Sequence, residues 1–357
     1  MAFWRKKSKQ TFRERVDEFW KWFPTVADRY RECLLENRGN DVVPEVSKTI
    51  DKLLPGMCWV FGIEDKEKGL ASFTMTGEGQ ITRQLLADYW QSQAVPVSNW
   101  TFFGSRQPSS AESLKNMGIQ VSGQQQVDAD TFLLRTTVDD ENQTIDIAAW
   151  HPAFAELGEE HHMQILFIFL DEALGEFGTQ TWLGEITIDS SVTEGETRSL
   201  SELPAFIESI EKYHEWEKLS PLEAYTGYEI REQSSGRRGD TIVGSTCVAN
   251  LVGEFLNNNG RLQEDPLPGI GAEFVYVAVD GAVFPDGEQV DVRANIEDAI
   301  NEALKPHSGG RSLGGAFGVD ESYIEFLLFD GDNSRSIISA TLNELQLGGR
   351  SRLENFL

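Results

Sequence analysis

Residues 274–357 alternate between two hydrophobic periods, and this alternation restricts the possible fold more than any other feature of the chain. Strand-like runs of β-branched and aromatic residues are separated by apolar residues spaced as on one face of a helix. The expected elements are a strand, a helix, two strands of a hairpin, a helix and a last short strand, at residues 274–279, 293–304, 313–318, 323–329, 334–346 and 353–356. This order predicts the split β-α-β, or ferredoxin-like, arrangement.

A comparable order recurs in the N-terminal half. Strand-helix-strand patterns occupy residues 70–105 and 143–188, and a glutamine-rich segment and a further strand lie between them. The segment Asp189–Ser199 has no apolar period and is the best candidate for a domain boundary. We therefore expect an α+β protein of two domains, residues 1–191 and 192–357. Each should contain a mixed or antiparallel sheet with helices on one face, and the C-terminal domain should be ferredoxin-like.

A helical extension precedes the first strands. Apolar residues recur every three or four positions from Phe12 to Cys33, which indicates amphipathic helices. Pro24 interrupts this stripe, because proline lacks an N–H and clashes with the carbonyl four residues earlier, so we expect two helices, at 10–22 and 25–36. Such a stripe packs either on its own domain or against a second copy of the chain, and the first arrangement is the more common one.

The extreme N-terminus differs in charge from the rest of the chain. Residues 5–15 are rich in lysine and arginine and follow the aromatic pair Phe3 and Trp4. A basic, aromatic tail can dock on a membrane surface or on an acidic partner. The alternative, which we favour, is a terminus that folds back on an acidic body.

The overall composition excludes several classes of function. The chain has 58 acidic and 31 basic residues, a net charge of −27, so it repels phosphate backbones and we expect no nucleic-acid binding. The cysteines Cys33, Cys58 and Cys247 are widely spaced and form no CxxC motif, which is typical of free thiols in a cytoplasmic protein. No apolar run reaches the roughly 18 residues of a membrane span, so we expect no transmembrane segment. The oligomeric state stays open.

One long acidic stretch is the most unusual charge feature. No lysine or arginine occurs between Arg135 and Arg198, whereas acidic residues are frequent there. Their repulsion must be screened by salt, by another part of the chain or by a partner. A basic protein partner and a solvated acidic face are both consistent with this pattern. The candidate partner surface comprises Asp139, Asp140, Glu141, Glu159, Glu160, His161 and His162.

The same residues offer weak grounds for metal binding or catalysis. Imidazole and carboxylate groups suit divalent ions, but the adjacent His161 and His162 point in different directions on a helix, and no HExxH motif is present. The glycines between Gly309 and Gly318 match neither a Walker loop nor a dinucleotide fingerprint, which favours close packing within a hairpin. We therefore expect no metal, no cofactor and no catalytic residue. Whether the protein is an enzyme stays open, and a non-enzymatic role is favoured.

Several segments resemble uncharacterised bacterial α+β proteins. The resemblance is carried by the glycine-rich hairpin and strand at Gly310–Asp330, and by Phe19–Phe23, Trp100–Gln107 and Leu170–Glu176. It implies a family of unknown function and supplies no functional residues.

These observations favour a cytoplasmic interaction or regulatory protein whose acidic surface meets a basic partner. The alternative is an enzyme or small-ligand-binding protein with a site in the cleft between the two domains. Converging carboxylates and a histidine in a deep pocket would support that alternative.

Overall fold

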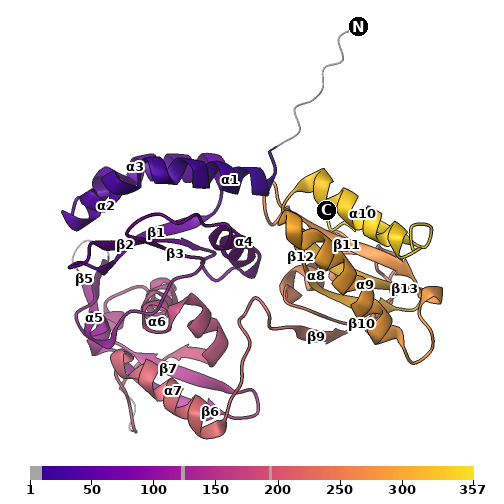
Figure 1. Cartoon of the computed structure of the whole chain (residues 1–357). Coiled ribbons are helices and arrows are strands. Elements are labelled where there is room, and N and C mark those ends of the chain that lie inside the picture. The colour runs from indigo at the N-terminus through magenta and orange to yellow at the C-terminus, as the bar shows by residue number, and fades with distance from the viewer. Residues whose placement is uncertain (1–9, 122–124, 193–194) are drawn as a thin grey trace.

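The computed structural model describes residues 10–121, 125–192 and 195–357 (Figure 1). It is a mixed α+β protein with several sheets, as the sequence predicts. The basic tail Phe3–Lys9 and Glu194 of the acidic stretch lie outside the described residues. Within the described parts of the chain, no helix is long and apolar enough to cross a bilayer.

The first layer is a small sheet covered by three helices. Its elements are β1 (Cys58–Asp65), β2 (Leu70–Thr76), α4 (Ile81–Ser92) and β3 (Trp100–Phe103). Strands β1 and β2 form an antiparallel hairpin, and α4 crosses over so that β3 pairs parallel with β2. Above them lie α1 (Phe12–Trp22), α2 (Ala27–Leu35) and α3 (Val43–Leu53) (Figure 1). The predicted stripe from Phe12 to Cys33 is buried on this sheet, so it packs on its own chain.

A second body follows and has its own core. It consists of α5 (Ala111–Lys115), β4 (Gly118–Val121), β5 (Gln125–Asp128), β6 (Leu133–Asp139), β7 (Thr144–Trp150), α6 (Glu159–Trp182), β8 (Leu183–Ile188) and α7 (Leu203–His214). Strands β6, β7 and β8 form a separate three-stranded sheet, with β7 and β8 parallel across α6. Helix α6 lies between the two small sheets (Figure 1). The pair β4–β5 lies in the glutamine-rich segment, and its apolar residues Ile119, Val121 and Val127 pack in or against the second core.

Helix α7 belongs to the second body. Leu200, Leu203, Ile207 and Trp216 are buried in its core. The apolar side of α7 therefore has its partners in the second body. The division of the chain at 191 and 192 stays a prediction.

The C-terminal part is one six-stranded antiparallel sheet in the order β14-β11-β13-β12-β10-β9. Its elements are β9 (Thr226–Glu229), β10 (Thr241–Thr246), α8 (Ala249–Asn257), β11 (Glu273–Asp280), α9 (Gln289–Leu304), β12 (Gly310–Gly318), β13 (Glu321–Leu328), α10 (Gly331–Glu344) and β14 (Ser351–Asn355). From β11 onward the order is strand-helix-strand-strand-helix-strand.

Helices cover both faces of this sheet, whereas the sequence predicts helices on one face. Alternate residues of β11 point to opposite faces. Val275 and Val277 pack in a core with Ile300 of α9 and residues of α10. Tyr276 lies on the other face and contacts the Phe255 ring of α8, with 5.9 Å between ring centroids.

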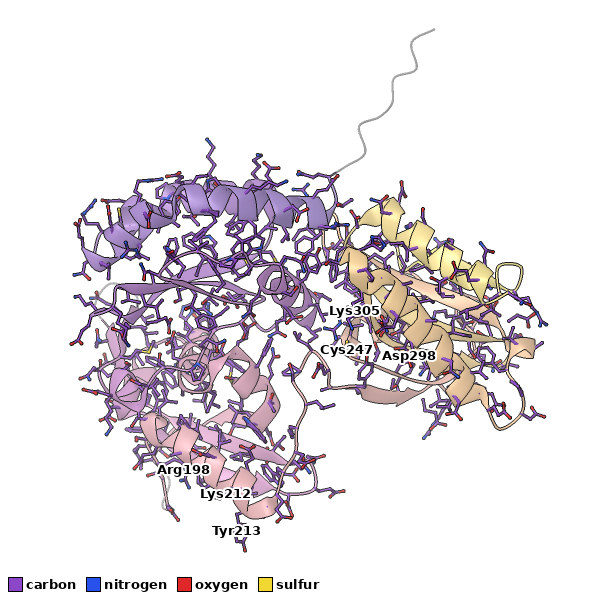
Figure 2. All side chains as sticks on the ribbon, viewed as in Figure 1. Arg198, Lys212, Tyr213, Cys247, Asp298 and Lys305 are labelled. Atoms are coloured by element: carbon purple, nitrogen blue, oxygen red, sulfur yellow. The ribbon has the colours of Figure 1, made fainter. Side chains whose placement is uncertain are left out.

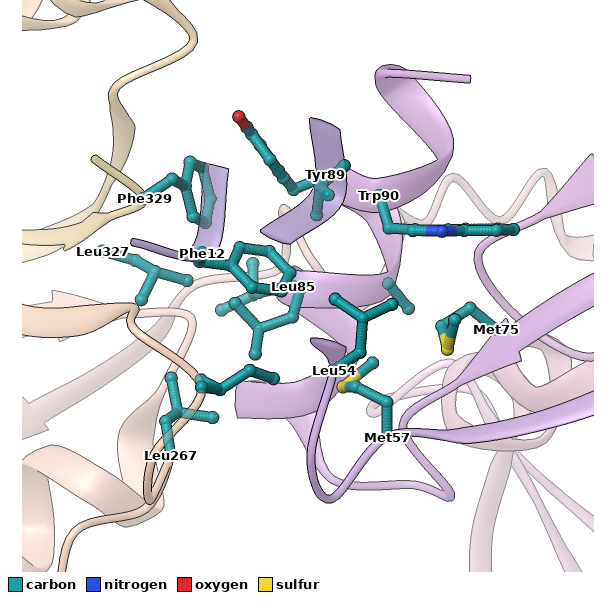
Figure 3. Packing of buried hydrophobic residues seen from close by; sticks show 14 of the residues in the cluster. Phe12, Leu54, Met57, Met75, Leu85, Tyr89, Trp90, Leu267, Leu327 and Phe329 are labelled. Carbon is teal, nitrogen blue, oxygen red and sulfur yellow. The ribbon is translucent and has the colours of Figure 1, made fainter. Parts of the chain in front are cut away.

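The N-terminal layer and the C-terminal sheet share one hydrophobic core (Figure 3). The rings of Phe12 and Tyr89 lie 5.4 Å apart, and each contacts Phe329, at 5.9 and 4.0 Å between centroids. Next to them, Arg13 forms an ion pair of 3.0 Å with Asp330. These contacts fix the start of α1 at the junction between the two parts.

A fully buried ion pair lies inside the C-terminal sheet. Arg238 donates from Nη2 to Glu325 Oε1 at 2.8 Å, and both side chains have no exposed surface. The guanidinium lies 4.8 Å from the Tyr323 ring centroid and 5.3 Å from that of Tyr276. Aromatic faces thus surround this cation.

Candidate functional site

The structure divides the predicted partner surface between two places. Asp139, Asp140 and Glu141 form the turn between β6 and β7, where Asp139 pairs with Thr144. Glu159 and Glu160 begin α6, which follows the opposite end of β7. The two acidic groups therefore lie at opposite ends of the β6–β7 hairpin.

The turn residues have structural partners. Asp139 accepts hydrogen bonds from the backbone N–H and the side-chain amide of Asn142, at 3.1 and 2.7 Å, and these bonds lower its pKa. Asp140 accepts from Trp216 Nε1 at 2.7 Å and lies 2.9 Å from His214 Nδ1. These bonds close the turn and attach it to the end of α7.

The two histidines have different environments. His161 is exposed and lies 3.8 Å from Glu160. His162 is buried, stacks on Phe154 with 4.4 Å between ring centroids, and its Nε2 lies 2.9 Å from the Leu157 carbonyl oxygen. His162 is therefore part of the core. In the described residues, no group of three His, Cys, Asp or Glu side chains could hold a metal ion.

Beyond its acidic start, α6 exposes apolar side chains. Met163, Phe167 and Ile168 are 36%, 40% and 42% exposed, and they occupy the same outward face as Glu160 and Gln164. Three large apolar side chains grouped on one helix form a patch, unlike single exposed ones.

The α6 groove, a hollow of about 630 Å³, runs beside this patch. Gln164, Phe167, Ile168 and Asp171 form one wall, and the loop Glu78–Gln80, Arg106, Thr179 and Gln180 lie around the remainder. Glu176 lies at its buried side and is 1% exposed. The groove therefore combines an apolar wall with three carboxylates and one guanidinium.

Four donors hold the Glu176 carboxylate. Oε1 accepts from Gly79 N–H at 3.0 Å and from Gln84 Nε2 at 2.8 Å. Oε2 accepts from the Thr76 hydroxyl at 2.7 Å and from Arg106 N–H at 3.4 Å. This network satisfies a charge that would otherwise be costly to bury, and it joins α6 to the first sheet.

A break in α6 makes this network possible. Gly175 has φ 74° and ψ 161°, a conformation that is strained for residues with a side chain. A Cβ at this position would lie 2.9 Å from the Arg106 carbonyl oxygen. That oxygen accepts a hydrogen bond of 3.0 Å from Glu176 N–H. Glycine thus allows the helix to turn and present Glu176 to the loop.

The groove retains negative charge. Arg106 is paired with Glu78 at 2.6 Å. Burial raises the pKa of Asp171, and the neighbouring Glu176 and Glu78 carboxylates raise it further. A positively charged ligand group would relieve this repulsion.

A larger hollow, the central cleft of about 980 Å³, lies between the N-terminal part and the C-terminal sheet. The start of α4, the end of α6, residues 217–226 and α8 line it, and it shares Gly79, Gln80 and Gln180 with the α6 groove. Glu217 and Glu254 are among its lining residues, and no histidine is. This hollow has carboxylates but no histidine in its lining, and a functional site in a cleft between two domains stays a prediction.

Sequence reasoning missed most of this site. Glu78, Arg106 and Glu176 are separated in the sequence, and no motif links them. The acidic stretch did contain Asp171 and Glu176, but their burial depends on contacts with the first sheet. The exposure of Phe167 and Ile168 could not be predicted either, because α6 is apolar on most of its circumference and the sequence does not show which side stays uncovered.

Comparisons with known proteins give no relative: no protein-family model, no curated protein and no solved structure matches the chain. The resemblance to bacterial α+β proteins of unknown function stays a prediction.

Proposed function

We propose that the protein is an interaction protein that binds a basic, partly apolar segment of a partner protein along α6 and the α6 groove. The observation that carries the proposal is the exposure of Met163, Phe167 and Ile168, 36%, 40% and 42%, on a helix face whose other residues are polar or acidic. An acidic face that contacts only water would not need exposed apolar side chains. Covering them would remove apolar surface from water, which favours association.

The charges at both ends of the patch define its occupant. Glu159 and Glu160 lie at the start of α6, and Asp171 lies at the other end, beside Glu78. The helix rises about 16 Å from Glu160 to Asp171. The complementary segment therefore has basic side chains about 16 Å apart and apolar side chains between them.

A direct test uses a synthetic helical peptide of about fifteen residues, long enough to span this distance, with lysines near both ends and leucines on the face between them. Its binding to the full chain is measured by fluorescence anisotropy at low and high salt. We expect saturable binding that weakens as salt is added. A peptide of the same composition in scrambled order should bind markedly less.

Matched variants separate this site from general acidity. Glu159→Lys with Glu160→Lys should weaken binding, whereas Asp286→Lys with Glu288→Lys, an equal charge change in an exposed loop of the C-terminal part, should have little effect. Equal losses of affinity in the two double variants would show that only the net charge matters, and this would overturn the proposal.

The apolar contribution has its own control. Phe167→Ser should weaken binding about tenfold if this ring is a buried anchor in the complex. Val290→Ser replaces an exposed apolar residue on α9 and should leave the affinity unchanged. Unchanged affinity in Phe167→Ser would contradict docking on α6. Because Phe167 is already partly exposed, its variant should keep the unfolding midpoint of the parent protein, which confirms folding.

The alternative function, binding of a small ligand between the two halves, is favoured by one specific observation. The central cleft is of the size of small-molecule sites, which run from roughly 300 to 1,000 Å³. It is a second hollow beside the α6 groove, and variants of Phe167 do not alter its lining. A location in the cytoplasm stays a prediction for either function.

A further inference from the structure

We propose that the central cleft is a carbonyl-binding site in which the amine of Lys218 forms an imine with a small neutral aldehyde or ketone. This inference is independent of peptide docking on α6. It rests on the placement of Lys218, on the lack of a charged partner for its amine, and on the cleft around it.

Lys218 is held in a defined position at the cleft. Its Nζ donates to the Thr181 carbonyl oxygen at 2.8 Å and lies 6.0 Å from the centroid of the Trp182 ring. The neighbouring Trp216 is buried and stacks on Trp182, with 6.4 Å between centroids. The chain on both sides of Lys218 lines the same cleft. The amine therefore has one fixed hydrogen bond and can direct its lone pair elsewhere.

Partial burial lowers the pKa of Lys218, and no charged neighbour contributes to this shift. In the described parts of the chain, the structure has no ion pair to this amine, although Glu217 and Glu254 line the same cleft. A lysine that is partly desolvated and has no carboxylate partner is more readily deprotonated to the neutral amine that forms imines with carbonyl compounds.

The other nucleophile of the cleft is suppressed. Cys247 lies on the side of the C-terminal sheet that faces the N-terminal part (Figure 2). Burial raises the pKa of its thiol to about 11, so it stays protonated at neutral pH. The amine is therefore the better nucleophile of the two.

The cleft also defines the ligand. Its walls mix apolar side chains, such as Ile81, Pro221 and Leu251, with the amides of Gln180 and Asn250. An uncharged molecule with an apolar body and a few polar groups fits this lining.

The reaction balances without a further reagent. The lone pair of the neutral Lys218 amine forms a bond to the carbonyl carbon, and one proton moves from the nitrogen to the carbonyl oxygen. The carbinolamine then loses its hydroxyl group together with the remaining nitrogen proton as water, which leaves a carbon–nitrogen double bond. In the test below, cyanoborohydride supplies a hydride to the imine carbon, water supplies a proton to the nitrogen, and the product is a stable secondary amine.

The experiment uses the full chain, benzaldehyde as the probe and cyanoborohydride as the trap, with modified lysines located by peptide mass spectrometry. Lys212 is the internal control, because it is exposed near the outer end of α7 (Figure 2). At neutral pH, Lys218 should be modified several-fold faster than Lys212. This ratio should decrease above about pH 11, where ordinary lysines are also neutral.

Two further measurements test the cleft itself. The rate at Lys218 should saturate with benzaldehyde concentration, because the probe binds before it reacts, whereas the rate at Lys212 should rise linearly. Lys218→Arg should remove the fast modification, and an unchanged unfolding midpoint shows that the fold is retained. Equal rates at the two lysines, or linear dependence at both, would overturn the proposal. Since Phe167→Ser leaves the cleft intact, failure here leaves the docking proposal untouched.

Discussion

Replacing Glu176 by glutamine tests whether the carboxylate network joins α6 to the first sheet. Each oxygen of Glu176 accepts two hydrogen bonds, so the carboxylate is surrounded by four donors. A glutamine has one accepting oxygen and one NH₂ group. Whichever way the amide is placed, its NH₂ faces a backbone N–H, either that of Gly79 or that of Arg106.

The magnitude follows from this count of donors. Gln84 can partly compensate by rotating its amide, since its Oε1 has no partner in the structure. At least one buried N–H is still left without an acceptor, which costs about 1–3 kcal/mol, and the remaining bonds lose their charge assistance. We expect Glu176→Gln to lower the free energy of unfolding by about 2–4 kcal/mol.

The assay is urea unfolding followed by tryptophan fluorescence, combined with hydrogen exchange. Glu172→Gln is the matched control, because Glu172 lies on the same helix and accepts from one side chain, the Ser109 hydroxyl at 2.8 Å. It should cost less than about 1 kcal/mol. Exchange of the Gly79 amide should accelerate in the Glu176 variant alone. Equal losses of stability in the two variants, with equal exchange at Gly79, would refute the reasoning.

Three further outcomes are expected. Gly175→Ala should lower the free energy of unfolding by about 1–3 kcal/mol, because φ is positive there and the added Cβ would meet the Arg106 backbone. Gly253→Ala is the control: the space around its added Cβ is open, so it should stabilise α8 by about 0.5–1 kcal/mol. The folded-state pKa of Asp171 is raised, so its charged form opposes folding above the unfolded pKa. Asp171→Asn should therefore raise Tm at pH 7 and leave Tm unchanged near about pH 3. An equal rise in Tm at both pH values would contradict this reasoning. Arg238→Met should cost about 3–5 kcal/mol in urea unfolding by leaving Glu325 buried without a cation, and adding Glu325→Leu should recover most of this loss.

The order of helices and strands was largely predictable from the sequence. The strand-helix-strand patterns in both halves correspond to observed elements, because each pattern depends on the spacing of neighbouring residues. The break at Pro24 was predictable for the same reason, since the clash of a proline is local. The glutamine-rich pair β4–β5 was missed, because each strand has four residues and the alternation at Ile119 and Val121 is too short to stand out among polar neighbours.

The arrangement of these elements required the tertiary structure. The sequence pattern of α7 shows an apolar face but not which body covers that face. The burial of His162 was equally unpredictable, because the three residues before it are polar and exposed. The break at Gly175 could not be predicted, since its reason is the Arg106 backbone, far away in the chain.

The sequence by itself determined the acidity of the region between Arg135 and Arg198 and the strands and helices that carry it. Only the tertiary structure decided which of its carboxylates are exposed, which one is buried in a network, and where apolar side chains stay uncovered beside them. Charge and hydrophobic period are properties of neighbouring residues, whereas a groove or a buried carboxylate is made by segments distant in sequence. The Thr76–Glu176 contact, which spans one hundred positions, is of this second kind.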